Sequence, residues 1–224
     1  REKLSVQVHP GDEYAMKNEN ELGKTEAWYV IDAKPNAKLI VGTKNCTKKE
    51  FEKAIEENRT EDYLNVIDVK KGDAFLINSG MVHAICEGLI IAEIQQNSDV
   101  TYRVYDYGRQ RELHVKKSLD VIDFNLKAEN LSNSKIENFE IFDKVKLCKN
   151  KYFAMEKINI QNKYISSSEK ERFHIITCVD GEGSISGGSI SEEIKIGDSI
   201  LIPANLGQYE IVGNISVLRS YVTI

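Results

Sequence analysis

The sequence predicts an all-β protein built from two similar β units with a short helical insertion. Three observations support this prediction: short apolar runs bounded by turn residues, one well-marked helical segment between them, and a motif that recurs in the C-terminal part. The chain has 224 residues, of which 41% are hydrophobic and 29% charged, so it can form one large or two small globular domains. The spacing of the apolar runs is typical of a sandwich or a barrel.

The apolar runs are rich in β-branched and aromatic residues, which favour strands. The clearest of them are Ala27–Ile31, Lys38–Val41, Ala74–Ile77 and Leu89–Ile94. A helix should interrupt them after Thr47–Glu50, which has the spacing of a capping box and precedes an apolar stripe at helical period. A second helix is expected over about residues 114–124.

The order of the segments predicts two domains and a linker. Residues 126–138 are rich in Asn, Ser, Lys and Glu and should join a domain at 1–125 to a domain at 139–224. The second domain resembles a degenerate copy of the first, because Gly72–Asp73 and the apolar run after it recur as Gly197–Asp198 at the same spacing. Gln208 stands in this copy where the first copy has His83, so we expect the second copy to keep the fold and lack the site.

The composition argues against two classes of partner. The net charge is −5, and Lys and Arg alternate with Glu and Asp, so nucleic acid is not expected. No apolar run approaches the roughly 20 residues that a membrane span requires, and nothing resembles a signal peptide. We therefore expect a cytoplasmic protein that does not bind membranes, with its widely spaced cysteines as reduced thiols. The oligomeric state cannot be read from the sequence.

Four polar residues have the types and positions of a metal site: Gln7, His9, Glu26 and His83. Alternate residues of a strand share one face, so Gln7 and His9 can point into one cavity, and Glu26 and His83 could complete a tetrahedron. Two imidazoles, a carboxylate and an amide oxygen suit zinc, with iron or manganese as alternatives.

Several motifs together resemble a known family: Ser5–Pro10, Gly23–Glu26, Gly72–His83, Gln95–Arg109 and Arg111–His114. The segment ending at His83 is similar to the second motif of the cupins, which are small antiparallel jelly-roll barrels with a metal in the mouth. The whole set resembles the type I mannose-6-phosphate isomerases in their short bacterial form. The resemblance implies two cupin-like β-barrels, of which the first lacks N-terminal strands that the family usually has.

The resemblance also implies a function. A member of this family would be a zinc-dependent aldose–ketose isomerase that interconverts mannose 6-phosphate and fructose 6-phosphate through an enediolate. It would hold one zinc ion per chain on Gln7, His9, Glu26 and His83. Arg103 would be the active-site arginine, and Lys24 and Arg109 would hold the sugar phosphate.

The chemistry of such a reaction agrees with these roles. Negative charge grows on two adjacent oxygens, where a divalent cation and a permanently charged guanidinium are stabilising. Lys24 could move protons between those oxygens or bind the anion. A further group must carry the carbon-bound proton, and we expect Glu93, whose apolar strand should raise its pKa.

Each assignment has an alternative. Arg103 could pair with an aspartate, and Glu93 could be a structural hydrogen-bond acceptor. The chain could also be a non-catalytic sugar- or metal-binding cupin module, or another metal-dependent cupin enzyme such as a dioxygenase. The cationic set of Lys24, Arg103 and Arg109 favours a sugar phosphate over an oxidative reaction.

Overall fold

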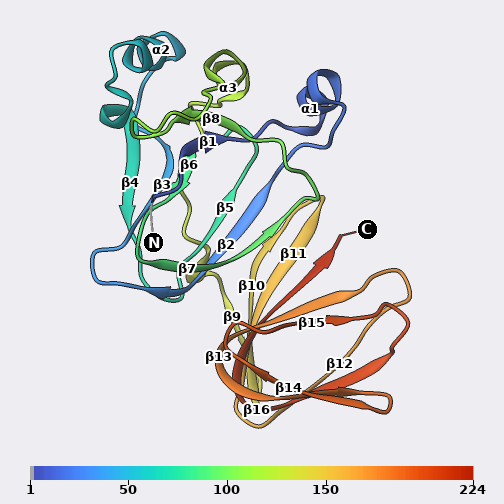
Figure 1. The fold of residues 1–224 in the computed structure, drawn as a ribbon. Coiled ribbons are helices and arrows are strands. Elements are labelled where there is room, and N and C mark those ends of the chain that lie inside the picture. Colours follow the sequence, from blue (N-terminus) through green and yellow to red (C-terminus); the bar gives the residue numbers. More distant parts are fainter. Residues whose placement is uncertain (1–2, 224) are drawn as a thin grey trace. The chain divides into compact units, whose positions relative to one another are not determined.

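The fold comes from a computed structural model that describes residues 3–223. It consists of two compact units, which divide between Asn130 and Leu131 (Figure 1). Both are built mainly from antiparallel strands, which confirms the all-β prediction. None of the helices in the described part of the chain has the length and apolar character needed to cross a membrane.

The first unit contains two antiparallel sheets and several short helices. Its strands are β1 (Val6–Val8), β2 (Glu26–Ala33), β3 (Lys38–Thr43), β4 (Leu64–Asp68), β5 (Ala74–Ile77), β6 (His83–Ile85), β7 (Leu89–Gln95) and β8 (Tyr102–Tyr105). Its helices are α1 (Asp12–Glu19), α2 (Lys48–Glu56), η1 (Thr60–Tyr63) and α3 (Val115–Val121). The four apolar runs expected as strands form β2, β3, β5 and β7.

The two sheets of this unit share a hydrophobic core. One sheet has the order β4-β3-β6-β1-β8 and the other has the order β5-β2-β7. Trp28 and Phe75 from the smaller sheet pack with Leu39 and Val41 from the larger one, and all four are buried. The other face of the larger sheet forms a second cluster with residues from α2 and α3, including Phe51 and Leu119. The space between the sheets is therefore the interior of the unit.

The helices agree only in part with the sequence. The capping box before α2 is confirmed, since the Thr47 side chain accepts a hydrogen bond from the Glu50 amide and the Glu50 carboxylate accepts one from the Thr47 amide. Helix α3 is present but ends earlier than the expected 114–124. Helix α1 was not predicted, because Ala15 is its one buried residue and an apolar stripe is lacking. Its start lies against Gly23, where a Cβ atom would lie 2.5 Å from the Asp12 nitrogen.

The second unit is a curved sheet system dominated by two long strands. Its elements are η2 (Leu131–Asn133), β9 (Ile136–Asn138), β10 (Phe142–Lys149), β11 (Phe153–Ile160), β12 (Lys163–Ser167), β13 (His174–Gly187), β14 (Ile190–Lys195), β15 (Ser199–Ile202) and β16 (Gln208–Val222). Strand β16 pairs with β12 through its first half and with β11 through its second half. Gly183 of β13 stands opposite Gly213 of β16, where added Cβ atoms would lie within 2.6 Å of the facing backbone.

The strand pairing is consistent with the cupin-like all-β fold that the resemblance implied. Within residues 3–223 the paired strands form open sheets in both units rather than closed barrels. The segment 126–138, expected as a linker, contains the division between the units, and it also carries η2 and the edge strand β9.

Candidate functional site

Strand register brings three of the predicted site residues side by side. Gln7 of β1 is the direct neighbour of His83 on β6 and of Arg103 on β8. His83 is in turn opposite Val41, whose side chain belongs to the core between the sheets. Because directly opposed residues in a sheet point to the same face, Gln7, His83 and Arg103 all belong to the inner face.

Glu26 reaches the same interior from the opposite sheet. It begins β2, and Trp28, two residues later on the same face, packs edge-on against the His83 ring with 5.3 Å between ring centroids. His9 follows β1 directly. Nitrogen and oxygen atoms of His9, Glu26 and His83 lie within 4.8 Å of one another, and all three residues are buried.

Backbone carbonyls fix both histidine rings. His9 Nδ1 lies 2.8 Å from the Val100 carbonyl oxygen, and His83 Nδ1 lies 2.8 Å from that of Met81. An imidazole that donates through Nδ1 carries its lone pair on Nε2. Both Nε2 atoms lie toward Glu26, at 3.2 Å from Oε1 for His9 and 3.8 Å from Oε2 for His83. Hydrogen bonds from Nδ1 to a backbone carbonyl are typical of histidines that bind a metal through Nε2, because they fix the orientation of the ring.

The protonation states also suit a cation. Burial, followed by the charge of His9, lowers the pKa of His83 to about 4, so this ring is neutral near pH 7. Burial would raise the pKa of Glu26, but its contacts with His9, His83 and Lys24 outweigh that effect and lower it. A metal ligand must be deprotonated, and both groups are.

Three buried polar atoms also bear on the fit to a cation. His9 Nε2 and both carboxylate oxygens of Glu26 have no hydrogen bond of normal geometry among residues 3–223, although Glu26 Oε1 forms ion pairs with His9 and Lys24. Buried polar atoms without a well-formed hydrogen bond are rare and costly. Gln7 lies beside the cluster, with its amide nitrogen 3.3 Å from His83 Nε2, so its amide group is close enough to contribute to a site built on these residues.

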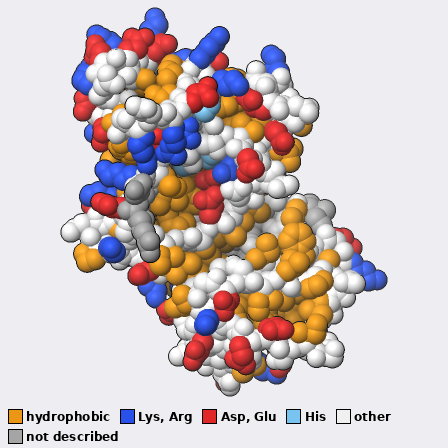
Figure 2. Space-filling view, viewed as in Figure 1, with side chains coloured by type: hydrophobic (Ala, Val, Ile, Leu, Met, Phe, Trp, Pro, Cys, Tyr) orange, Lys and Arg blue, Asp and Glu red, His pale blue; other side chains and the backbone are white. Residues whose placement is uncertain are grey.

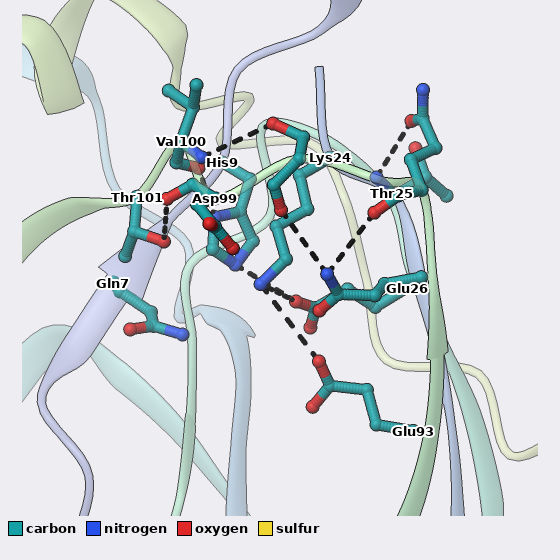
Figure 3. Close-up of polar contacts among 12 residues, drawn as sticks. Gln7, His9, Lys24, Thr25, Glu26, Glu93, Asp99, Val100 and Thr101 are labelled. Atoms are coloured by element: carbon teal, nitrogen blue, oxygen red, sulfur yellow. Dashed lines mark hydrogen bonds and ion pairs between the residues drawn. The ribbon is translucent and has the colours of Figure 1, made fainter. Parts of the chain in front are cut away.

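Lys24 and Glu93 lie beside this cluster (Figure 3). Lys24 Nζ is 2.8 Å from Glu26 Oε1 and 4.0 Å from Glu93 Oε1, and its side chain is 11% exposed. Glu93 lies on β7, and its side chain is 31% exposed. Burial, reinforced by the charge of Glu26, raises the pKa of Glu93 to about 7. The sequence-based expectation of a raised pKa therefore agrees with the structure.

The two arginines have different surroundings. Arg103 donates to Ser5 Oγ and to the Glu112 carbonyl. Arg109 instead pairs with Asp106, which also binds Arg111, and donates to the Lys3 carbonyl. Within the described part of the chain, none of the contacts recorded for Arg109 reaches the His9–Glu26–His83 cluster.

Sequence reasoning missed two contributions to the site. One is Trp28, a buried core residue whose position two residues after Glu26 places it on the same strand face. The other is the pair of backbone carbonyls of Met81 and Val100 that contact the histidine rings. Every residue type has a backbone carbonyl, so the sequence does not indicate which ones do so. Figure 2 shows histidine atoms among Lys, Arg, Asp and Glu side chains at the surface of the first unit, while His9 and His83 are each only 1% exposed.

An antiparallel β unit that gathers two histidines and a glutamate between its sheets is the architecture of the cupin class. The family profile described as "Mannose-6-phosphate isomerase, cupin domain" matches residues 143–222. Mannose-6-phosphate isomerase ManA of Bacillus subtilis is 40% identical over 97% of this chain and 71% of its own length. The Streptococcus mutans mannose-6-phosphate isomerase is 34% identical over 97% of this chain and 70% of its own. The chain therefore belongs to the mannose-6-phosphate isomerase family of enzymes.

Solved structures agree with this membership. The crystal structure of the Bacillus subtilis mannose 6-phosphate isomerase superposes with a TM-score of 0.90 at 33% identity, covering 98% of this chain and 72% of that one. A putative mannosephosphate isomerase from Archaeoglobus fulgidus, at 23% identity and a TM-score of 0.77, shares the fold.

Proposed function

We propose that the protein is a zinc-dependent isomerase that interconverts mannose 6-phosphate and fructose 6-phosphate through an enediolate, in the cytoplasm. The observation that carries the proposal is the buried His9–Glu26–His83 cluster, whose nitrogen and oxygen atoms lie within 4.8 Å of one another and which lies beside an acid–base pair of Lys24 and Glu93. Membership of the isomerase family supplies the substrate.

Zinc fits the donor set better than a hard cation does. Two imidazoles, a carboxylate and an amide oxygen match zinc coordination, whereas calcium and magnesium prefer oxygen ligands alone. Gln7, His9, Glu26 and His83 would hold the ion. When bound, zinc supplies Lewis-acid stabilisation of the sugar oxygens at C1 and C2.

Glu93 is the group proposed to carry the carbon-bound proton. In the direction of fructose 6-phosphate, its carboxylate takes the proton from C2, and the C2–H electrons form the C1=C2 bond of the enediolate. The same carboxyl group then returns a proton to C1. A pKa of about 7 lets it act in both steps near neutral pH.

The basic side chains complete the reaction. Lys24 Nζ lies between Glu26 and Glu93 and moves the hydroxyl proton from O2 to O1. Arg103 shares the inner face with Gln7 and places a fixed positive charge near the developing enediolate. Arg109 supplies a cation for the phosphate from the turn after β8.

The experiment combines metal analysis with a coupled assay of fructose 6-phosphate formation. Wild-type protein should contain one zinc per chain, lose activity on chelation and recover it with zinc. His83→Ala should lose both metal and activity, while the matched control His114→Ala should keep stoichiometric zinc, because His114 is outside the cluster. Full zinc content in the His83 variant would contradict the ligand set. A zinc-loaded protein without turnover would contradict the isomerase.

A further inference from the structure

The chain has a single tryptophan, Trp28, and it packs against His83 of the candidate site. Trp28 is 1% exposed and stands on β2 between the two sheets. Its ring meets the His83 ring edge-on, with an interplanar angle of 77°. The one polar atom of this side chain, the indole nitrogen, is buried.

The indole N–H has no hydrogen-bond partner of normal geometry among the described residues. A buried donor without a partner costs free energy, and most buried tryptophans find one. Leaving this donor free is therefore unfavourable unless a group close by can accept from it.

Glu93 is that group. Trp28 and Glu93 are directly opposed residues of the β2–β7 pair, so their side chains rise from the same face of the sheet about 5 Å apart at Cβ. The indole also acts to lower the pKa of the Glu93 carboxyl, against the larger opposing effects of burial and of Glu26. Both observations place the donor within reach of the carboxylate.

We propose that Trp28 is a positioning residue of the isomerase, whose indole N–H orients the Glu93 carboxylate while its ring holds the His83 imidazole in place. The catalytic role of Trp28 rests on the proposed function, whereas the contact between Trp28 and Glu93 does not depend on it. Phenylalanine could supply the ring packing and could not supply the donor, so the two parts of the role can be separated.

The contact can be tested without activity. One tryptophan gives one indole signal in a ¹H–¹⁵N spectrum of the full chain, so that signal reports directly on Trp28. Glu93→Gln should move it, because the acceptor changes from a carboxylate to an amide. Glu87→Gln, a change of an exposed glutamate in the turn before β7, should leave it in place. An unmoved indole signal in the Glu93 variant would overturn the contact, whether or not the protein is an isomerase.

Kinetics test the positioning role. Trp28→Phe should lower kcat about tenfold or more, as expected for losing a hydrogen bond to a charged group, with KM and zinc content unchanged. Replacing Trp28 with 3-benzothienylalanine, which keeps the ring shape and lacks the N–H, should give the same loss. Trp28→Leu, which also removes the packing on His83, should weaken zinc binding as well.

A double-mutant cycle decides whether Trp28 acts through Glu93. In the Glu93→Gln background, Trp28→Phe should lower kcat little further. Additive losses would overturn the proposal, as would loss of zinc from Trp28→Phe in proportion to its loss of activity. An inactive wild-type enzyme would refute the proposed function instead, and the indole spectrum would still decide the contact.

Discussion

Replacing Arg219 should strongly destabilise the second unit. Arg219 donates through Nε and Nη2 to one oxygen of Glu156, at 3.1 and 2.5 Å, and through Nη1 to Tyr164 and Ser166. The side chains of Arg219 and Glu156 are only 13% and 4% exposed. Arg219→Ala would leave the Glu156 charge buried without its cation, which typically costs about 3–5 kcal/mol.

The cost can be compared with two controls. Lys163→Met removes an ion pair with Glu210 whose side chains are 42% and 35% exposed, so it should cost at most about 1 kcal/mol. Replacing both buried partners, Glu156→Leu with Arg219→Met, should recover most of the stability, because no unpaired charge remains. Hydrogen exchange of β11 and β16 amides measures the opening free energy of this unit. A loss below about 1 kcal/mol for Arg219→Ala would refute the reasoning.

Three further predictions concern the site and the pH dependence of stability. Glu93→Gln should lower kcat by a factor of about 10²–10⁴ and leave zinc content unchanged, and near-normal turnover in a steady-state assay would exclude it as the proton carrier. Arg103→Ala should lower kcat by about 10² or more, whereas an effect on KM alone would make Arg103 a binding residue. Burial, followed by the charge of Arg219, lowers the pKa of His174 to about 4, so between pH 6.5 and pH 4 the unfolded chain binds a proton at His174 more readily than the folded chain does. The contribution of His174 to the free energy of unfolding should therefore be complete above about pH 6.5 and decrease toward pH 4 by at most about 1.4 kcal/mol per pH unit. Urea titrations in which His174→Gln loses as much stability in acid as the wild type would contradict this.

The strands of the first unit were predictable because their signal is local. β-branched and aromatic runs bounded by turn residues predicted β2, β3, β5 and β7, and the capping box predicted the start of α2. Helix α1 has no comparable signal, since a single buried Ala15 leaves no stripe and a close contact with Gly23 fixes its start. The sequence also could not predict whether the sheets close into barrels, because closure depends on which edge strands pair.

The site was predictable to the extent that residue type determines chemistry. Histidine and glutamate on or beside strands predicted candidate ligands, and the structure gathers His9, Glu26 and His83 into one buried cluster. The side-chain direction of Arg109 could not be inferred, because its pairing with Asp106 depends on the turn that follows β8. The backbone carbonyls that orient the two histidines also could not be predicted from composition or residue spacing.

The central claim is isomerisation by proton transfer through an enediolate, and one measurement tests it most directly. Unlabelled mannose 6-phosphate is incubated with the zinc-loaded protein in D₂O, and the fructose 6-phosphate formed is examined by NMR for deuterium at C1. Glu93 carries the proton in this account and its side chain is 31% exposed, so it should exchange with solvent and deliver deuterium to C1 in a substantial part of the product. Absence of fructose 6-phosphate, or product without any deuterium at C1, would contradict the account.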